Sequence, residues 1–254
     1  MRLVMLAMAI AISGVATAHA QTKRVDNLFV SGQTAVGGDA TSRGGGAEWL
    51  HPTSDLETLD VGAFVGTSAG GWFTYGRLGG ILARPRATLS GALDLGGGKE
   101  GRVRFSYTRA RTEVDVPLGS PRALAQTEVD HIRVAGNIVT GFRFGGAFQV
   151  TPRFSTTISS HTYVSGGDAS PAGSVRGDYA TGRWRVLGGM FFSKRPSLSS
   201  TAVDLSPTLH ATRTTFAGMQ VRAGAQEIVG VVDVSEQPRG RVATVLLSVR
   251  VPLQ

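Results

Sequence analysis

The sequence predicts an all-β protein, and three observations support this prediction. Apolar and polar residues alternate in many short segments, which is the pattern of strands with two unlike faces. Clusters of glycine, proline and aspartate separate these segments, as hairpin turns do. Many of the 35 glycines also fall inside apolar stretches, where they would weaken a helix, and no window longer than the first 20 residues keeps its apolar residues at helical spacing.

The chain begins with a segment that has the three parts of a secretory signal peptide. Arg2 supplies the basic start, an apolar run extends to Gly14, and small residues follow up to Ala18-His19-Ala20. An uncleaved anchor is the alternative, but the apolar run is short for a membrane span. We expect cleavage after residue 20, so that residues 21–254 form one exported domain without disulfides, since the chain has no cysteine.

Six of the alternating segments are especially clear, and we count about twelve in all, each of roughly 10 residues. The six apolar faces, in chain order, are Leu59, Val61, Ala63 and Val65; Ala87, Leu89, Leu93 and Leu95; Phe142, Phe144, Phe148 and Val150; Trp184 and Val186; Ala217, Met219 and Val221; and Ala243, Val245, Leu247, Val249 and Val251.

Turns are expected where glycine, proline and aspartate gather between the segments. These positions are 37–39, 52–55, 70–71, 84–86, 97–99, 166–168 and 237–240. The polar stretches 113–124, 165–176 and 194–208 are predicted to be larger loops on one side of the sheet.

Two β architectures fit this pattern, a soluble periplasmic β-sandwich that binds a ligand and a closed transmembrane barrel. Aromatic residues lie near predicted strand ends, as at Trp49, Trp72 and Phe191-Phe192, which favours the barrel. Arginines alternating with small residues also suit a wet lumen. The arginines predicted to face the lumen are Arg77, Arg104, Arg143, Arg183, Arg185, Arg222 and Arg250.

The chain resembles the bacterial outer-membrane β-barrel proteins in its signal peptide, its regular succession of hairpins and its last strand, which runs to Pro252-Leu253-Gln254. The resemblance covers residues 25–254 and carries no catalytic residue. It implies an antiparallel transmembrane barrel of about twelve strands, in a range of about 10 to 14. It also implies that outer-membrane lipid and the barrel assembly machinery are partners. The chain departs from the family in ending at Gln254 rather than at an aromatic residue.

Charge adds an expectation about solutes. The chain has 26 basic and 18 acidic residues, a formal charge of +8, so an arginine-lined lumen would attract small anionic solutes. The alternative is that the arginines pair with inward acids, and the candidates are Asp60, Asp94, Asp130 and Asp233. Both readings fit a passive channel or a structural or export-associated membrane component.

A lipid hydrolase is the enzymatic alternative. Gly66-Thr67-Ser68-Ala69-Gly70, with Gly44-Gly45-Gly46 upstream, resembles the nucleophile elbow and oxyanion loop of patatin-like lipases. A catalytic Ser68 would need a helix after it, whereas residues 72–80 read as a glycine-rich strand. We therefore interpret this motif as a hairpin.

A second serine lies near a histidine. Ser159 and His161 are expected on one side of one strand, and Asp178 is a candidate orienting acid. A polar pair in the lumen is the simpler interpretation. We assign no catalytic residue.

No metal site, cofactor or nucleic-acid partner is expected. The histidines stand singly, no cysteine is present, the glycine clusters lack the lysine of a phosphate-binding loop, and the basic charge is diffuse.

Overall fold

The computed structural model describes residues 25–37, 41–68, 70–120, 122–200, 207–238 and 240–253. Regular structure in these ranges is strand, and they contain no helix with the length and hydropathy to cross a bilayer. The predicted signal peptide, 1–20, and its cleavage site lie outside the described residues.

The described residues form fourteen antiparallel strands. Their bounds are β1 Asp26–Gly37, β2 Ser42–Pro52, β3 Glu57–Ser68, β4 Gly71–Arg84, β5 Ala87–Glu100, β6 Val103–Pro117, β7 Ala123–Val134, β8 Asn137–Gln149, β9 Phe154–Ser165, β10 Asp168–Thr181, β11 Trp184–Ser200, β12 Pro207–Ala223, β13 Gln226–Gln237 and β14 Gly240–Leu253.

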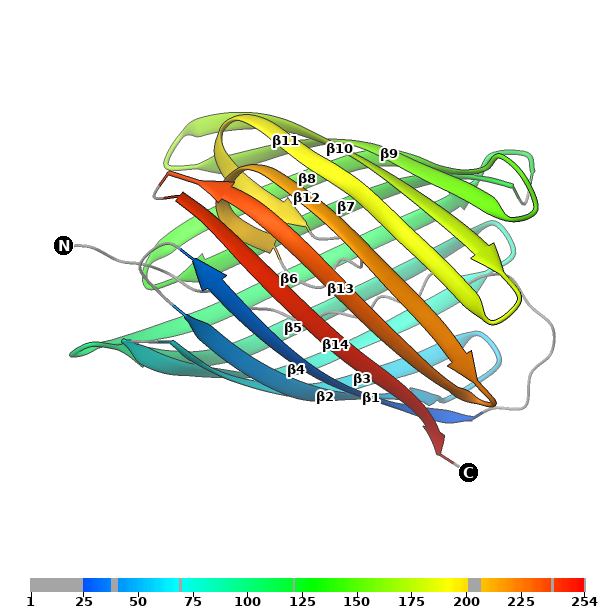
Figure 1. The fold of residues 1–254 in the computed structure, drawn as a ribbon, viewed down its shortest axis with the longest axis horizontal. Coiled ribbons are helices and arrows are strands. Elements are labelled where there is room, and N and C mark those ends of the chain that lie inside the picture. The colour runs from blue at the N-terminus through cyan, green and yellow to red at the C-terminus, as the bar shows by residue number, and fades with distance from the viewer. Residues whose placement is uncertain are drawn as a thin grey trace.

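Each strand pairs with its neighbours in sequence, and β1 pairs with β14, so the sheet closes into a barrel (Figure 1). The seam is regular from Asp26 opposite Leu253 to Gly37 opposite Val242. The closure confirms the barrel and overturns the β-sandwich alternative. The count of fourteen lies at the upper end of the expected range, above the twelve we counted from the sequence.

The strand number fixes where the first strand begins and the last strand ends. Because it is even, β1 begins and β14 ends at the same end of the barrel, which we call the terminal rim (Figure 1). The opposite end, where β1 turns into β2, is the far rim. With strands ~4.8 Å apart and tilted by ~40°, a fourteen-stranded wall has a diameter of about 28 Å. That is wider than the eight-stranded barrels that side chains just fill.

Large parts of the predicted loops are strand in the structure, whereas residues 118–120 lie between strands as predicted. Residues 113–117 end β6, residues 168–176 belong to β10, and 194–200 continue β11. Residues 97–99, predicted as a turn, lie inside β5, and the turn follows at 101–102. The reason is the same in each case: an inward polar face or a glycine-rich wall has the composition of a loop.

Alternation places an apolar band on the outside. Leu78, Phe144 and Leu247 are among its members, and each is more than half exposed. Toward the terminal rim the same outer face carries aromatic residues, as expected where strands leave the hydrocarbon of a membrane. These are Trp49, Phe148, Phe154, Tyr179 and Trp184.

Candidate functional site: the inner face of the barrel

The inner face has two layers. On β4, β6 and β7, reading from the far rim, aromatic or aliphatic side chains come first and charged ones follow. The order is Phe73, Tyr75 and then Arg77 on β4; Tyr107 and then Arg109 and Arg111 on β6; and Val134, Ile132 and then Asp130 and Glu128 on β7. A solute entering at the far rim therefore meets the apolar layer before the charged one.

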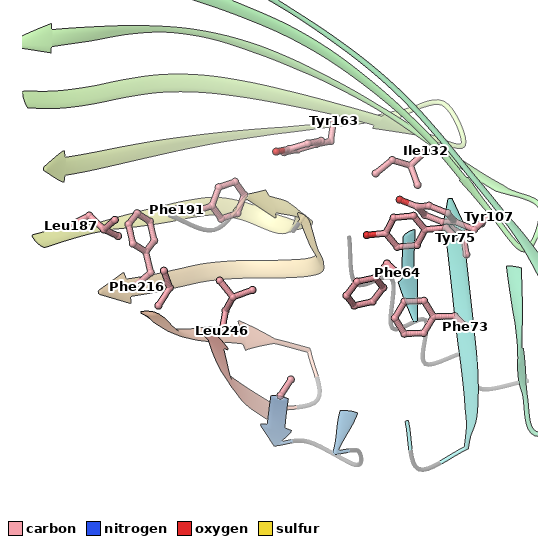
Figure 2. Close-up of a cluster of buried hydrophobic side chains, with 13 residues drawn as sticks. Phe64, Phe73, Tyr75, Tyr107, Ile132, Tyr163, Leu187, Phe191, Phe216 and Leu246 are labelled. Carbon is pink, nitrogen blue, oxygen red and sulfur yellow. The ribbon is translucent and has the colours of Figure 1, made fainter. Parts of the chain in front are cut away.

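The apolar layer contains a row of neighbouring aromatic rings, two pairs of which are stacked and one tilted. The ring centroids of Phe73 and Phe64 are 5.5 Å apart, those of Phe64 and Tyr75 5.3 Å, and those of Tyr75 and Tyr107 5.4 Å. We call these four residues the aromatic row. Figure 2 shows them together on one side of the interior, with Leu187, Phe191, Phe216 and Leu246 on the other.

Glycines let these rings lie close to the wall. A Cβ at Gly66 would overlap the ring of Phe73, and one at Gly46 would come within 2.8 Å of the Phe64 ring. Gly96 lies between Tyr75 and Tyr107 in the sheet, so both side chains lean over it. The aromatic row thus covers bare backbone instead of projecting straight into the lumen.

The charged layer begins with two forked ion pairs. Arg77 donates from Nε to Asp94 Oδ1 at 2.7 Å and from Nη2 to Oδ2 at 3.0 Å. Arg109 donates in the same way to Asp130, at 2.9 and 2.7 Å. All four side chains are buried. Such two-point contacts fix both partners in one geometry.

A four-residue network follows on β6, β7 and β8. Arg111 Nη2 lies 3.1 Å from both Glu113 Oε2 and Glu128 Oε2. Arg143 Nη2 lies 2.7 Å from Glu113 Oε1 and 2.8 Å from Glu128 Oε2. The two carboxylates, which face each other across neighbouring strands, are thereby held together by two guanidinium groups.

Two smaller groups complete the charged layer. Asp178 is 2.8 Å from Arg176 Nε and 3.0 Å from Arg185 Nη2. Glu227 lies 3.5 Å from Arg222 and 3.8 Å from Arg250 at the terminal rim. The ion pairs of all these groups join residues on the same strand, on adjacent strands or on strands one apart. They therefore run along the wall.

The structure places five of the seven predicted arginines on the inner face: Arg77, Arg143, Arg185, Arg222 and Arg250. Arg104 lies opposite Lys99 on the outer face. Arg183 lies in the turn before β11, with its guanidinium 5.6 Å from the centroid of the Trp184 ring.

Three further inward arginines were missed, Arg109, Arg111 and Arg176. The signal for the first two was available, because Tyr107, Arg109, Arg111 and Glu113 alternate along one strand. Arg176 fell in a stretch predicted as loop. Of the proposed acid partners, Asp94 and Asp130 pair with arginines, Asp233 contacts Ser235, and Asp60 is buried on the inner face.

Ser159 and His161 do meet, on the inner face of β9. The Ser159 Oγ is 2.8 Å from His161 Nε2, and the Ser174 Oγ contacts both, at 2.6 and 3.1 Å. The Tyr163 hydroxyl is 3.2 Å from His161 Nδ1. Asp178, the predicted orienting acid, is bound by arginines instead. Backbone N–H groups around the serine are used in strand pairing, which leaves no oxyanion hole of the usual kind.

We therefore expect Ser159 to be unreactive. Incubation of the folded protein with a fluorophosphonate, followed by mass spectrometry, should leave Ser159 unlabelled under conditions that fully label a known serine hydrolase. Stoichiometric labelling that disappears in Ser159→Ala would contradict this expectation and revive the lipid-hydrolase alternative.

Ser68 has the hairpin context expected of it. It ends β3 and pairs with Gly71 at the start of β4, so a strand follows where a nucleophile elbow needs a helix. Ala69, within the motif, lies outside the described residues.

The histidines take separate structural positions. On the outer face His51 Nδ1 lies 2.8 Å from Asp26 Oδ1, and Trp49 donates to Asp26 Oδ2 at 3.1 Å. His131 contacts Thr140. In the part of the chain that the structure describes, no group of three or more His, Cys, Asp or Glu is arranged to hold a metal ion.

A scan against protein-family models found no match, and neither did a search of the curated proteins. Solved structures do match. The Pseudomonas putida toluene transporter TodX is similar with a TM-score of 0.65 over 90% of this chain and 89% of that chain, at 9% identity. The chain has the fold of the outer-membrane channel barrels. The monoaromatic hydrocarbon channel CymD gives 0.58 over 91% and 88% of the two chains, and Omp33 of Acinetobacter baumannii gives 0.53 over 90% and 99%, both at 9% identity.

Proposed function

We propose that the protein is a passive channel of the bacterial outer membrane, exported with a cleavable signal peptide and inserted by the barrel assembly machinery. One observation carries the proposal: the inward side chains lie along the wall, because the charges pair there and the rings cover glycines. A barrel wider than its side chains can fill then keeps room for solute. The outer apolar band and the aromatic residues at the terminal rim suit a lipid surround.

The charge pairing bears on which ions pass. The arginines of the inner face each have a carboxylate within 4 Å, and inward acids outnumber inward arginines among the described residues. Anion attraction by free guanidinium groups is therefore a weak basis for selectivity. The preference for small anionic solutes is the untested alternative, and we propose instead that the channel does not favour anions.

The aromatic row points to solutes with an apolar or aromatic part. Flat rings offer stacking to such solutes without strong binding, which suits passage. TodX is described as a toluene transporter and CymD as a monoaromatic hydrocarbon channel, and both have this fold. We therefore propose small, partly apolar molecules as the solute class.

Folding and channel activity are tested together. The protein should resist cold SDS and shift in mobility on boiling, and in planar bilayers it should give ion conductance with a reversal potential that shows no anion preference. Liposomes containing it should swell at least as fast in phenylalanine as in glutamine, which is of similar size. A heat-modifiable protein with neither conductance nor swelling would refute the channel and leave a structural role.

A further inference from the structure

A row of exposed residues crosses five strands on the outer face at the far rim. Arg43 of β2 faces Thr67 of β3, Thr67 faces Trp72 of β4, Trp72 faces Lys99 of β5, and Lys99 faces Arg104 of β6. All five side chains are exposed, Trp72 by 50%. We call these five residues the rim row.

The rim row carries three positive charges that pair with no acid among the residues that the structure describes. Lys99 and Arg104 are direct cross-strand partners, an arrangement that repels unless an anion lies between them. Arg102, in the adjoining turn, adds another exposed cation. None of the ion pairs among the described residues involves these four cations. Glu100, the acid next in sequence, falls on the inward register of β5.

The residues around the rim row indicate that it lies at the level of the lipid headgroups. Along the same strands, the outer face continues toward the middle of the barrel with Val65, Leu78 and Leu95, each more than half exposed. The rim row therefore lies where the strands leave the hydrocarbon, a level at which tryptophan is enriched. At that level the anionic groups available are those of lipid headgroups.

The far rim is the one expected to face the outside of the cell. The longest connection between two strands, the six residues between β11 and β12, lies at this rim. In outer-membrane barrels the longer connections are extracellular. Lipid at the rim row would then belong to the outer leaflet.

We propose that the rim row binds the phosphate groups of the lipid A part of lipopolysaccharide in the outer leaflet. The inference rests on the membrane location in the proposed function, and it concerns the outer face rather than the lumen. Guanidinium and ammonium groups from three strands would donate hydrogen bonds to one phosphorylated headgroup. The phosphate would also relieve the repulsion between Lys99 and Arg104. The hydroxyl of Thr67 and the indole N–H of Trp72 add neutral donors in the same row.

The test compares two triple variants with equal loss of charge. Arg43→Gln, Lys99→Gln and Arg104→Gln remove the cations of the rim row. Arg86→Gln, Arg122→Gln and Arg153→Gln remove exposed cations from turns at the terminal rim. Native mass spectrometry of each protein in detergent would be titrated with bisphosphorylated lipid A, with dephosphorylated lipid A and with inorganic phosphate.

We expect the rim-row variant to bind lipid A about 100-fold more weakly than the unaltered protein, and the terminal-rim variant to bind as the unaltered protein does. Dephosphorylated lipid A should bind weakly to all three. Equal binding by both triple variants, equal binding of dephosphorylated lipid A, or displacement of lipid A by millimolar inorganic phosphate would each overturn the proposal. Conductance in phosphatidylcholine bilayers should be unchanged in the rim-row variant, so a failed channel and a failed lipid site are distinguished.

Discussion

Replacing Asp130 with alanine is expected to destabilise the barrel by about 3–5 kcal/mol. The change would leave Arg109, a residue that is 3% exposed, without the carboxylate that accepts from its Nε and Nη2. A buried cation without its partner costs far more than the pair contributes. Urea unfolding from phospholipid micelles, followed by tryptophan fluorescence and by the heat-dependent shift in electrophoresis, would measure the loss.

Two control variants show whether the loss comes from the unpaired buried charge. In Arg109→Met with Asp130→Leu both charges are absent, so most of the stability should return. Arg241→Ala removes one partner of an exposed pair, Arg241 and Glu236, at 3.5 Å on the outer face, and should cost less than about 1 kcal/mol. If Asp130→Ala is as mild as Arg241→Ala, the inward pairs do not brace the wall.

The sequence predicted the architecture because the outer face is uniform. Lipid accepts only apolar side chains along the middle of each strand, so segments such as 87–95 and 243–251 alternate plainly. The inner face has no such constraint. Where polar residues or glycines fill it densely, as in 113–117 and 168–176, the strand has the composition of a loop, and the strand count came out too low.

The prediction of which arginines face inward depended on knowing where each strand begins. Arg104 alternates with small residues, but the turn at 101–102 sets the register of β6 so that Tyr107 and Arg109 face inward and Arg104 faces outward. A turn shifted by one residue would reverse this assignment. The ion pairs were harder still, because Arg111 and Glu128 meet only through the register between β6 and β7.

The prediction of a turn at residues 97–99 was wrong for a related reason. Residues 97–99 have the composition of a turn, yet Gly96 and Gly98 lie inside β5 beneath aromatic side chains. The sequence contains both halves of this packing, the rings of β4 and β6 and the glycines of β5. Only the pairing of strands shows that they belong together.

Replacing Gly96 with valine is the sharpest test of that packing. A Cβ at Gly96 would overlap the Thr74 carbonyl oxygen and lie 2.5 Å from Tyr75 Cβ and 2.6 Å from Tyr75 Cα. Backbone cannot move aside as a flexible side chain can, so β4 and β5 must separate locally. Tyr75 and Tyr107, on strands roughly 10 Å apart, would also lose the gap over which their rings meet. We expect a loss of about 3 kcal/mol in the same urea titration.

Gly230→Val is the matched control, because Gly230 lies within a strand on the outer face and has open space at its Cβ position. Valine there adds apolar surface toward lipid and a residue with high strand propensity, so stability should be unchanged or slightly higher. A loss at Gly96 with none at Gly230 would show that the glycines of the wall are required beneath the rings. Equal losses of stability at the two sites would mean that valine disturbs any strand position to the same extent. The glycines would then not be required beneath the aromatic row.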